Sequence, residues 1–290
     1  MKNITKINKI IETIGSGPLY CTLEDQEEYY CKRSTRLQAP HTDLINEVLL
    51  NYIFRFSNVP IPIIDIATLE YHQFERQLAE MYEELKDKHV FFKIKHPLKA
   101  NHFNIPLFAS QEIRYNSYIY DLGIEKLDVR PYLNPIDIVK IGFIDDWVMN
   151  TDRSPKNTNL LSTLSAEPHK LALVPIDHCR AFGNVGDYTT FIPQKKYKTG
   201  FNILESNFGR LLLSSIKKED LQHFFDVEIN SYIRQAELFV TETKQFVPDE
   251  WQFDENQMNA ITEILTHARR NATLIKNFRN TYIKPIRNDV

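Results

Sequence analysis

Three polar side chains of this chain have types and spacing that suit phosphoryl transfer: Asp152, Asn157 and Asp177. Asp152 and Asn157 form an Asp-x4-Asn pattern, and Asp177 follows twenty residues after Asn157. In kinases, one carboxylate orients the attacking hydroxyl, while an Asn and a second Asp hold Mg²⁺ against the phosphate oxygens. The pattern therefore predicts a Mg²⁺-dependent phosphotransfer centre. The alternative is a plain turn, in which Asp152 and Asn157 bond to loop amides and Asp177 merely ends a strand.

The elements around these residues predict that they converge. Residues 159–162 and 171–176 have the pattern of two short strands, and the polar stretch 162–170 reads as the loop that joins them. If the two strands pair as a hairpin, Asn157 and Asp177 flank the same open end of it. Asp152 then lies one loop away from both.

Three features earlier in the chain favour the same chemistry. Lys32 ends a predicted strand, Glu47 lies on a predicted helix, and a glycine turn at Gly15-Ser16-Gly17 precedes both. A strand Lys paired with a helix Glu positions the ATP phosphates in kinases, and glycine amides approach phosphates closely. Each feature has a plainer interpretation, namely a solvated strand end, a solvent-facing Glu and an ordinary hairpin turn. The order of all five features along the chain favours the kinase interpretation.

With these residues in place, the chain resembles the HipA-like kinases, atypical bacterial Ser/Thr kinases related to toxin–antitoxin kinases. The resemblance spans roughly residues 12–275, and its most specific part is the Asn-x-Asp-Arg-x3-Asn-x-Asn run that starts at Asn150. The other matching segments are Tyr29-Tyr30-Cys31-Lys32, Leu44-Ile45-Asn46-Glu47, Val59-Pro60-Ile61-Pro62, Phe143-Ile144-Asp145-Asp146-Trp147, Val174-Pro175-Ile176-Asp177-His178, Pro248-Asp249-Glu250-Trp251 and Ala268-Arg269-Arg270.

The resemblance implies a two-lobed protein-kinase-like fold with ATP and Mg²⁺ in the cleft. It implies Asp152 as the catalytic base, Asn157 and Asp177 as metal ligands, and Lys32 as the phosphate-binding lysine. The chain is shorter than full HipA toxins, so a toxin role is not carried over. His178-Cys179 stands where Phe-Gly follows the metal aspartate in typical protein kinases. Ser16 lies in the glycine turn, where toxin relatives are autophosphorylated, and its phosphorylation is a hypothesis here.

The periodicity of the remaining sequence predicts an α+β fold. Strands are expected at 19–23, 28–32, 61–66 and 107–113, and helices from Thr42, over 69–86, from an Asn134-Pro135 cap, and within 217–245 and 255–280. We expect a β-rich ATP-binding N-lobe over residues 1–115, and a mainly helical C-lobe with the catalytic loop and metal site over 116–290.

Composition narrows the function classes further. The 290 residues carry 35 Lys and Arg against 38 Asp and Glu, a net charge of −3, which argues against a dedicated nucleic-acid binder. Neither a signal peptide nor a membrane span is evident, and three unpaired-looking cysteines fit a reducing cytoplasm. Only eight glycines are present and none forms GxGxxG, so a typical Gly-rich loop is excluded.

The sequence therefore predicts a cytoplasmic ATP- and Mg²⁺-dependent kinase that phosphorylates a Ser/Thr hydroxyl of a protein. We expect a protein substrate, and an antitoxin-type or regulatory protein is a candidate partner. We expect neither a membrane nor a nucleic acid as a binding partner. Two rival functions use the same residues: a kinase for a small molecule or lipid headgroup, and a nucleotide-binding pseudokinase or interaction module.

Overall fold

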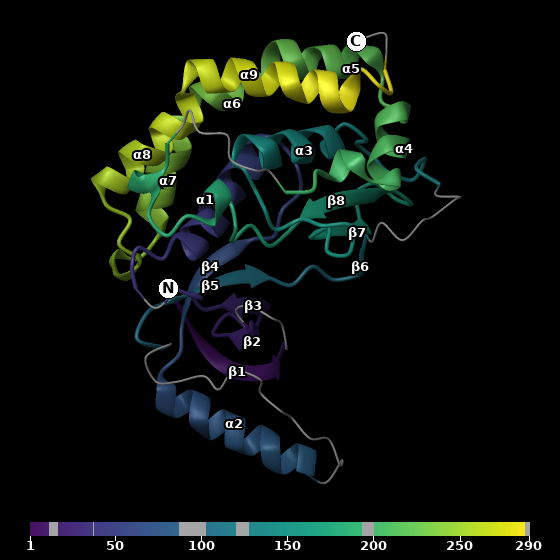
Figure 1. Cartoon of the computed structure of the whole chain (residues 1–290). Coiled ribbons are helices and arrows are strands. Elements are labelled where there is room, and N and C mark those ends of the chain that lie inside the picture. Colours follow the sequence, from purple (N-terminus) through teal and green to yellow (C-terminus); the bar gives the residue numbers. More distant parts are fainter. Residues whose placement is uncertain (12–16, 37, 87–102, 120–127, 193–199, 288–290) are drawn as a thin grey trace.

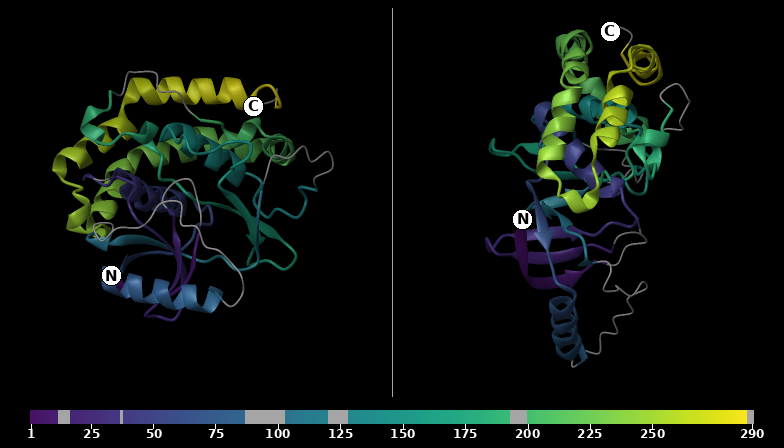
Figure 2. Two further views of the ribbon diagram at one scale, coloured as in Figure 1. Left: turned by 60° about the horizontal axis from the view of Figure 1, so that its bottom comes forward. Right: turned by 90° about the vertical axis from the view of Figure 1, so that its left-hand side faces the viewer.

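The structure is a computed structural model, and it describes residues 1–11, 17–36, 38–86, 103–119, 128–192 and 200–287. Strands and helices both contribute, as expected for an α+β fold. In Figures 1 and 2 the strands β1–β3 and helix α2 lie at one end of the molecule, and most helices lie at the other. None of the helices within the described residues is both long enough and apolar enough to cross a membrane.

A five-stranded sheet closes on itself in the order β1-β2-β3-β5-β4. All its neighbours are antiparallel except β1 and β4, which pair in parallel. Alternation of buried and partly exposed residues along β2 explains why this segment forms a strand with one face in the core. The strands are β1 (Lys2–Ile10), β2 (Leu19–Leu23), β3 (Glu28–Lys32), β4 (Ile64–Thr68) and β5 (Leu107–Gln111).

A second, three-stranded antiparallel sheet and the remaining helices follow in the chain. Its strands are β6 (Asn116–Tyr118), β7 (Leu160–Leu164) and β8 (Leu171–Pro175). The α-helices are α1 (Thr42–Phe56), α2 (Tyr71–Lys86), α3 (Asp137–Trp147), α4 (Asn207–Ser215), α5 (Lys218–His223), α6 (Ile229–Arg234), α7 (Ala236–Phe246), α8 (Glu255–Thr266) and α9 (Ala268–Phe278).

Helix α1 is packed almost entirely inside the protein. Twelve of its fifteen residues are buried. Its apolar side chains, such as Leu49 and Ile53, belong to the hydrophobic cluster that also holds α3, α7 and α8. A separate cluster fills the interior of β1–β3 and packs against Phe74 of α2. Glu47 is therefore carried by a helix that is anchored in the helical part of the molecule, whereas Lys32 is carried by the closed sheet.

The predicted elements match the structure with several differences. One is that the helical pattern over 255–280 forms two helices, α8 and α9, which meet at His267. The Asn134-Pro135 cap is wrong: Asn134 and Pro135 form a preceding turn, and α3 starts at Asp137 without a side-chain cap. The fourth strand begins at Ile64, because prolines at positions 60 and 62 disfavour ladder pairing. Strands β1 and β6 were not predicted, and the helical pattern over 217–245 is divided by a π-helical turn, Phe224–Glu228. The lobe boundary at residue 115 stays a prediction, and α1 packs across it.

Candidate active site

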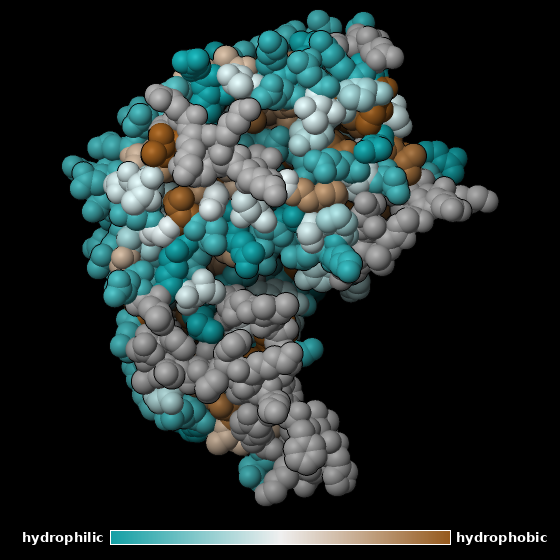
Figure 3. Space-filling view, in the orientation of Figure 1, coloured by the Kyte–Doolittle hydropathy of each residue, from teal (hydrophilic) through white to brown (hydrophobic). Residues whose placement is uncertain are grey.

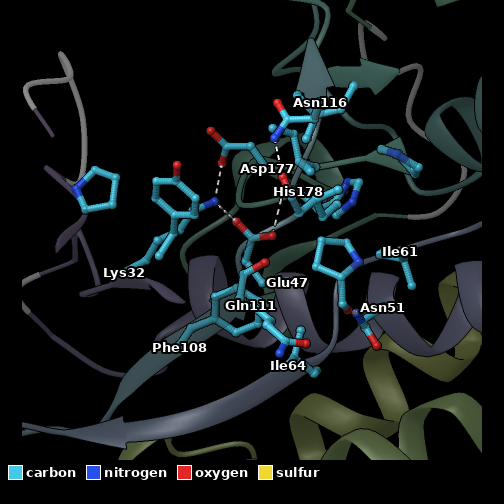
Figure 4. Close-up of a pocket in the computed structure, with 18 of the residues that line it drawn as sticks. Lys32, Glu47, Asn51, Ile61, Ile64, Phe108, Gln111, Asn116, Asp177 and His178 are labelled. Atoms are coloured by element: carbon cyan, nitrogen blue, oxygen red, sulfur yellow. Dashed lines mark hydrogen bonds and ion pairs between the residues drawn. The ribbon is translucent and has the colours of Figure 1, made fainter. Parts of the chain in front are cut away.

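Lys32, Glu47 and Asp177 meet at the centre of the candidate site (Figure 4). Lys32 Nζ lies 2.6 Å from Glu47 Oε1 and 2.9 Å from Asp177 Oδ1. The second carboxylate oxygen of Glu47 accepts a hydrogen bond from the backbone N–H of His178 at 3.0 Å. One ammonium group is thus shared by two carboxylates that lie 130 residues apart in the chain. The predicted pairing of Lys32 with Glu47 is present in the structure.

Each of these side chains comes from the end or the inner face of a regular element. Lys32 is the last residue of β3 and lies opposite Phe108 of β5. Glu47 is on the buried face of α1. Asp177 follows β8 in a left-handed backbone conformation, with φ of 57°. Asp adopts this conformation at lower cost than most residues, and here it turns the carboxylate toward Lys32.

Asp152 lies beside this trio and has a different neighbour on each carboxylate oxygen. Oδ2 is 3.4 Å from Asn159 Nδ2 and 3.6 Å from Cys179 Sγ. Oδ1 is 3.5 Å from Nε of Arg180. The Asn159 amide also lies 3.4 Å from the backbone carbonyl of Asp177, so it links the two aspartates. The hairpin therefore brings Asp152 and Asp177 together, as its predicted geometry required.

A buried ion pair holds the loop that carries Asp152. The Arg153 guanidinium, only 1% exposed, pairs through Nε with Asp145 of α3 and donates to the carbonyls of Thr158 and Asn159. Asp145 also accepts from Asn150 Nδ2 at 2.8 Å. These bonds tie both ends of the loop to one helix. Sequence reasoning quoted both charged residues only as part of the resemblance and gave them no role.

The structure places Asn157 and Asn159 differently from the expectation. Asn157 is exposed at the end of a tight turn closed by Ser154, and its side chain makes no hydrogen bond within the described residues. Asn159 is buried, has a left-handed φ of 48°, and faces Asp152. The metal-ligand role of Asn157 stays a prediction. The sequence indicates a role for Asn159 only through its place as the second Asn of the Asn157-Thr158-Asn159 run.

The electrostatics of the site separate the roles of the carboxylates. Burial disfavours the charged form of Asp177, but attraction to Lys32 outweighs it and lowers the pKa to about 2. Burial raises the pKa of Glu47 to about 7 against the opposing effect of Lys32. For Asp152, burial and then the charge of Asp177 raise the pKa, while Arg180 opposes the shift. Asp177 thus stays ionised, whereas Asp152 binds a proton more readily than an ordinary Asp.

A cavity of about 200 Å³ extends from this charged centre between the two sheets. Its lining is mostly apolar, and its charged groups, Lys32, Glu47 and Asp177, lie together at one end (Figure 4). The lining includes Tyr30, Ile64, Phe108 and Ser110 from the closed sheet, Asn51 from α1, Tyr118, Leu161 and Pro175 from the second sheet, and Ile176 directly after β8. A concave apolar slot with charged groups at one end suits a nucleotide, whose base is flat and whose phosphates are charged.

The donor set at the charged end fits a divalent cation. One ligand atom each from Glu47, Asp177 and Cys179 lies within 4.8 Å of the others. The Asp177 side chain is 37% exposed toward the cleft, so an ion could reach it. The carboxylate oxygens of Glu47 and Asp177 are ligands that suit Mg²⁺ or Mn²⁺, whereas the thiol of Cys179 suits softer metal ions.

The remaining predicted site residues belong to the glycine turn. Gly15 and Ser16 lie outside the described residues. Gly17 is described, with a left-handed φ of 53°, and the next residue, Pro18, lines the cavity. The end of the glycine turn is therefore beside the same cavity as Lys32.

His178, at the position of the Phe in D-F-G, is buried and packs on Phe54 with ring centroids 5.1 Å apart. Neither of its ring nitrogens has a hydrogen-bond partner in the described part of the chain, and burial lowers its pKa well below the usual value. Its neutral ring acts as an apolar contact between α1 and the segment after Asp177.

A family model described as HipA-like kinase matches residues 4–282. The chain belongs to the HipA-like kinase family. The match covers nearly the whole chain, and it includes every residue of the site described above.

Among solved structures, this HipA-like kinase is similar to a Golgi casein kinase, with 12% identity over 99% of this chain and 76% of the other and a TM-score of 0.48. A second structure of a Golgi casein kinase is described with Mn/ADP bound, with 12% identity over the same shares of each chain and a TM-score of 0.46. The Helicobacter pylori proinflammatory kinase CtkA gives 13% identity, 97% and 96% coverage, and a TM-score of 0.49. No curated protein sequence matches the chain.

The family match supports a kinase-type phosphotransferase as the general activity. Three contributions were missed by sequence reasoning: the Asn159 amide, the Arg180 guanidinium and the Asp145–Arg153 support. Arg180 had one signal, a basic residue three positions after Asp177.

Proposed function

We propose that this HipA-like kinase transfers the γ-phosphoryl group of ATP to a hydroxyl group, and that the acceptor is a Ser or Thr of a protein. The observation that carries the proposal is the arrangement at the end of the cavity. Lys32 is held between Glu47 and Asp177, and Asp152 lies next to them with its Oδ1 3.5 Å from Arg180 Nε.

In this proposal the base of ATP enters the apolar part of the cavity, and its phosphates lie along Lys32. Lys32 is oriented by Glu47 and balances phosphate charge, because an ammonium fixed by a buried carboxylate cannot move away. Asp177 would hold the divalent cation, with the amide of Asn159 or Asn157 as a second ligand. The ion, when bound, neutralises charge on the phosphate oxygens.

Asp152 acts on the acceptor. Its raised pKa makes the carboxylate a better proton acceptor than an ordinary Asp. The acceptor oxygen forms a bond to the γ-phosphorus while the bond from that phosphorus to the β–γ bridging oxygen breaks. The electron pair of that bond leaves with ADP, and the acceptor proton passes to Asp152 Oδ1.

The test measures ADP release and nucleotide binding by the same preparation. We expect ATP with Mg²⁺ to raise the melting temperature and to be turned over, and we expect Asp152→Ala and Asp177→Ala to abolish turnover in proteins that still melt cooperatively. Full ADP production by Asp177→Ala would contradict the site assignment. Binding without turnover by the unaltered protein would favour the nucleotide-binding interaction module.

The acceptor class is tested separately. Radiolabel from γ-labelled ATP should enter the protein fraction of a cell lysate and should appear as phosphoserine or phosphothreonine. Label that enters only metabolites or lipids would instead identify a small-molecule or lipid-headgroup kinase.

A further inference from the structure

We propose that Arg180 is a further catalytic residue, whose guanidinium contacts the transferred phosphoryl group in the transition state. This inference rests on the proposed phosphotransfer. It starts from the two oxygens of Asp152, which have unequal surroundings. Oδ2 faces the Asn159 amide and the Cys179 thiol, both from the interior of the site. Oδ1 faces Arg180, and it is the oxygen left for an incoming hydroxyl.

An acceptor that donates its proton to Oδ1 must therefore enter next to the Arg180 guanidinium. The Nε–Oδ1 distance of 3.5 Å is longer than an optimal N–H···O hydrogen bond, so this is a loose ion pair that can open for the acceptor. A hydroxyl bound to Oδ1 has its oxygen about 2.7 Å away from that oxygen. The phosphorus that it attacks is then within reach of the same guanidinium.

The backbone of Arg180 is fixed, and only its side chain is free to move. Thr151 donates to the Arg180 carbonyl through both its N–H, at 3.3 Å, and its hydroxyl, at 3.2 Å. Asn46 of α1 donates to the carbonyls on either side, those of Cys179 and Ala181. The Arg180 side chain is 55% exposed, in contrast to the 14% of Asp152. Because the backbone is fixed and the guanidinium is exposed, the Arg180 side chain can move with the phosphoryl group during transfer.

Two other cations near Asp152 and Asp177, Lys32 and Arg153, already have carboxylate partners. Lys32 is held by Glu47 and Asp177, and Arg153 is buried against Asp145. Negative charge spreads over the equatorial phosphoryl oxygens in the transition state, and an arginine that meets these oxygens accelerates transfer strongly. Its planar guanidinium can donate two hydrogen bonds to one phosphoryl group. Arg180 contacts Asp152 directly and has an exposed side chain, so it has both the position and the freedom for this role.

The experiment compares Arg180→Ala and Arg180→Lys with the unaltered full-length protein at saturating ATP and Mg²⁺. We expect Arg180→Ala to lower kcat by roughly 10²–10³-fold, as for the loss of one transition-state donor, with unchanged affinity for ADP. Arg180→Lys should retain an intermediate rate. Free guanidinium at non-denaturing concentrations should restore part of the Arg180→Ala rate, which a merely structural role would not allow.

A binding measurement supports the kinetic one. ADP with aluminium fluoride mimics the transition state of phosphoryl transfer. The unaltered protein should therefore bind this pair more tightly than ADP alone, and Arg180→Ala should lose that gain in affinity. Lys156→Ala is the matched control, because it removes an exposed positive charge from the neighbouring loop. Its kcat should change by less than about threefold, as is usual for an exposed charge without a specific contact.

Three results would overturn the inference. One is an unchanged kcat for Arg180→Ala with a raised KM for the acceptor, which would make Arg180 an acceptor-binding residue. Another is an equal loss for Lys156→Ala, which would reduce the effect to general electrostatics. The third is a full aluminium fluoride gain in Arg180→Ala. If the unaltered protein neither turns over ATP nor binds the mimic more tightly, the proposed function itself fails, and this inference fails with it.

Discussion

The buried Asp145–Arg153 pair offers the sharpest test of how the catalytic loop is held. Replacing Arg153 with Met keeps most of the side-chain volume and removes the charge. Among the described residues, Asp145 would then be a buried carboxylate with only the Asn150 amide as side-chain partner. The carbonyl of Thr158 would lose its donor, and the carbonyl of Asn159 would keep only the N–H of Ile176.

The expected loss of unfolding free energy in Arg153→Met follows from these contacts. Removing one partner of a buried ion pair costs about 3–5 kcal/mol, and the Thr158 carbonyl, left unsatisfied, adds about 1–3 kcal/mol when water cannot reach it. Relaxation of the loop offsets part of this sum, so we expect Arg153→Met to lower the free energy of unfolding by roughly 4–6 kcal/mol. Turnover should also fall about 10²-fold, because displacing a reacting group by about 1 Å has an effect of that size.

Chemical denaturation gives the free energies, and a double-mutant cycle isolates the pair. Asp145→Asn keeps the shape of the side chain and leaves the Arg153 charge uncompensated. The double variant has neither charge, so its loss should be smaller than the sum of the single losses by about 2–3 kcal/mol. Additive losses, or an Arg153→Met protein within about 1 kcal/mol of the unaltered one and fully active, would refute the idea that this pair holds the loop.

Two further predictions concern the surroundings of the site. Burial raises the pKa of Asp146, which bonds to Asn202, to about 7, far above its unfolded value, so its contribution to stability is greatest at acid pH and is lost as pH rises through 7. Asp146→Asn should therefore gain roughly 2–3 kcal/mol of unfolding free energy relative to the unaltered protein between pH 5 and pH 8, measured by denaturation at both pH values, and a constant difference would contradict this. A Cβ added at Gly200 would lie 3.0 Å from the Thr151 Cα, so Gly200→Ala should slow turnover by displacing the loop of Asp152. Gly186→Ala, whose Cβ meets only the flexible end of Arg36, is the control, and equal rates for the two variants would be evidence against this steric effect.

The local elements of the site were readable from the sequence because each has a strong short-range signal. The hairpin around Asp177 alternates apolar residues between turn-forming segments, and β7 and β8 pair as expected, with Leu160 opposite Pro175. Apolar spacing placed Glu47 on a helix. Once these elements exist, their ends dictate that Asp152 and Asp177 lie close together.

What the sequence could not supply depends on long-range packing. The burial of α1 among α3, α7 and α8 involves residues far apart in the chain, so local periodicity shows that a helix exists but not what covers it. The position of Asn159 beside Asp152 depends on a left-handed backbone conformation at a non-glycine residue. Nothing in the Asp-x4-Asn spacing signals this backbone conformation.

Figure 3 shows how hydrophobic residues are distributed over one face of the molecule. On the face shown in Figure 3, hydrophobic residues are scattered among hydrophilic ones and form no single broad patch.

The central claim is that Asp152 serves the acceptor and Asp177 serves the nucleotide-bound ion. The most direct measurement determines ATP affinity with and without divalent cation, together with turnover, for Asp152→Asn and Asp177→Asn. We expect Asp152→Asn to bind ATP and Mg²⁺ as tightly as the unaltered protein while losing turnover, and Asp177→Asn to lose the cation-dependent part of ATP affinity. Undiminished turnover by Asp152→Asn, or an undiminished effect of the cation in Asp177→Asn, would contradict the account.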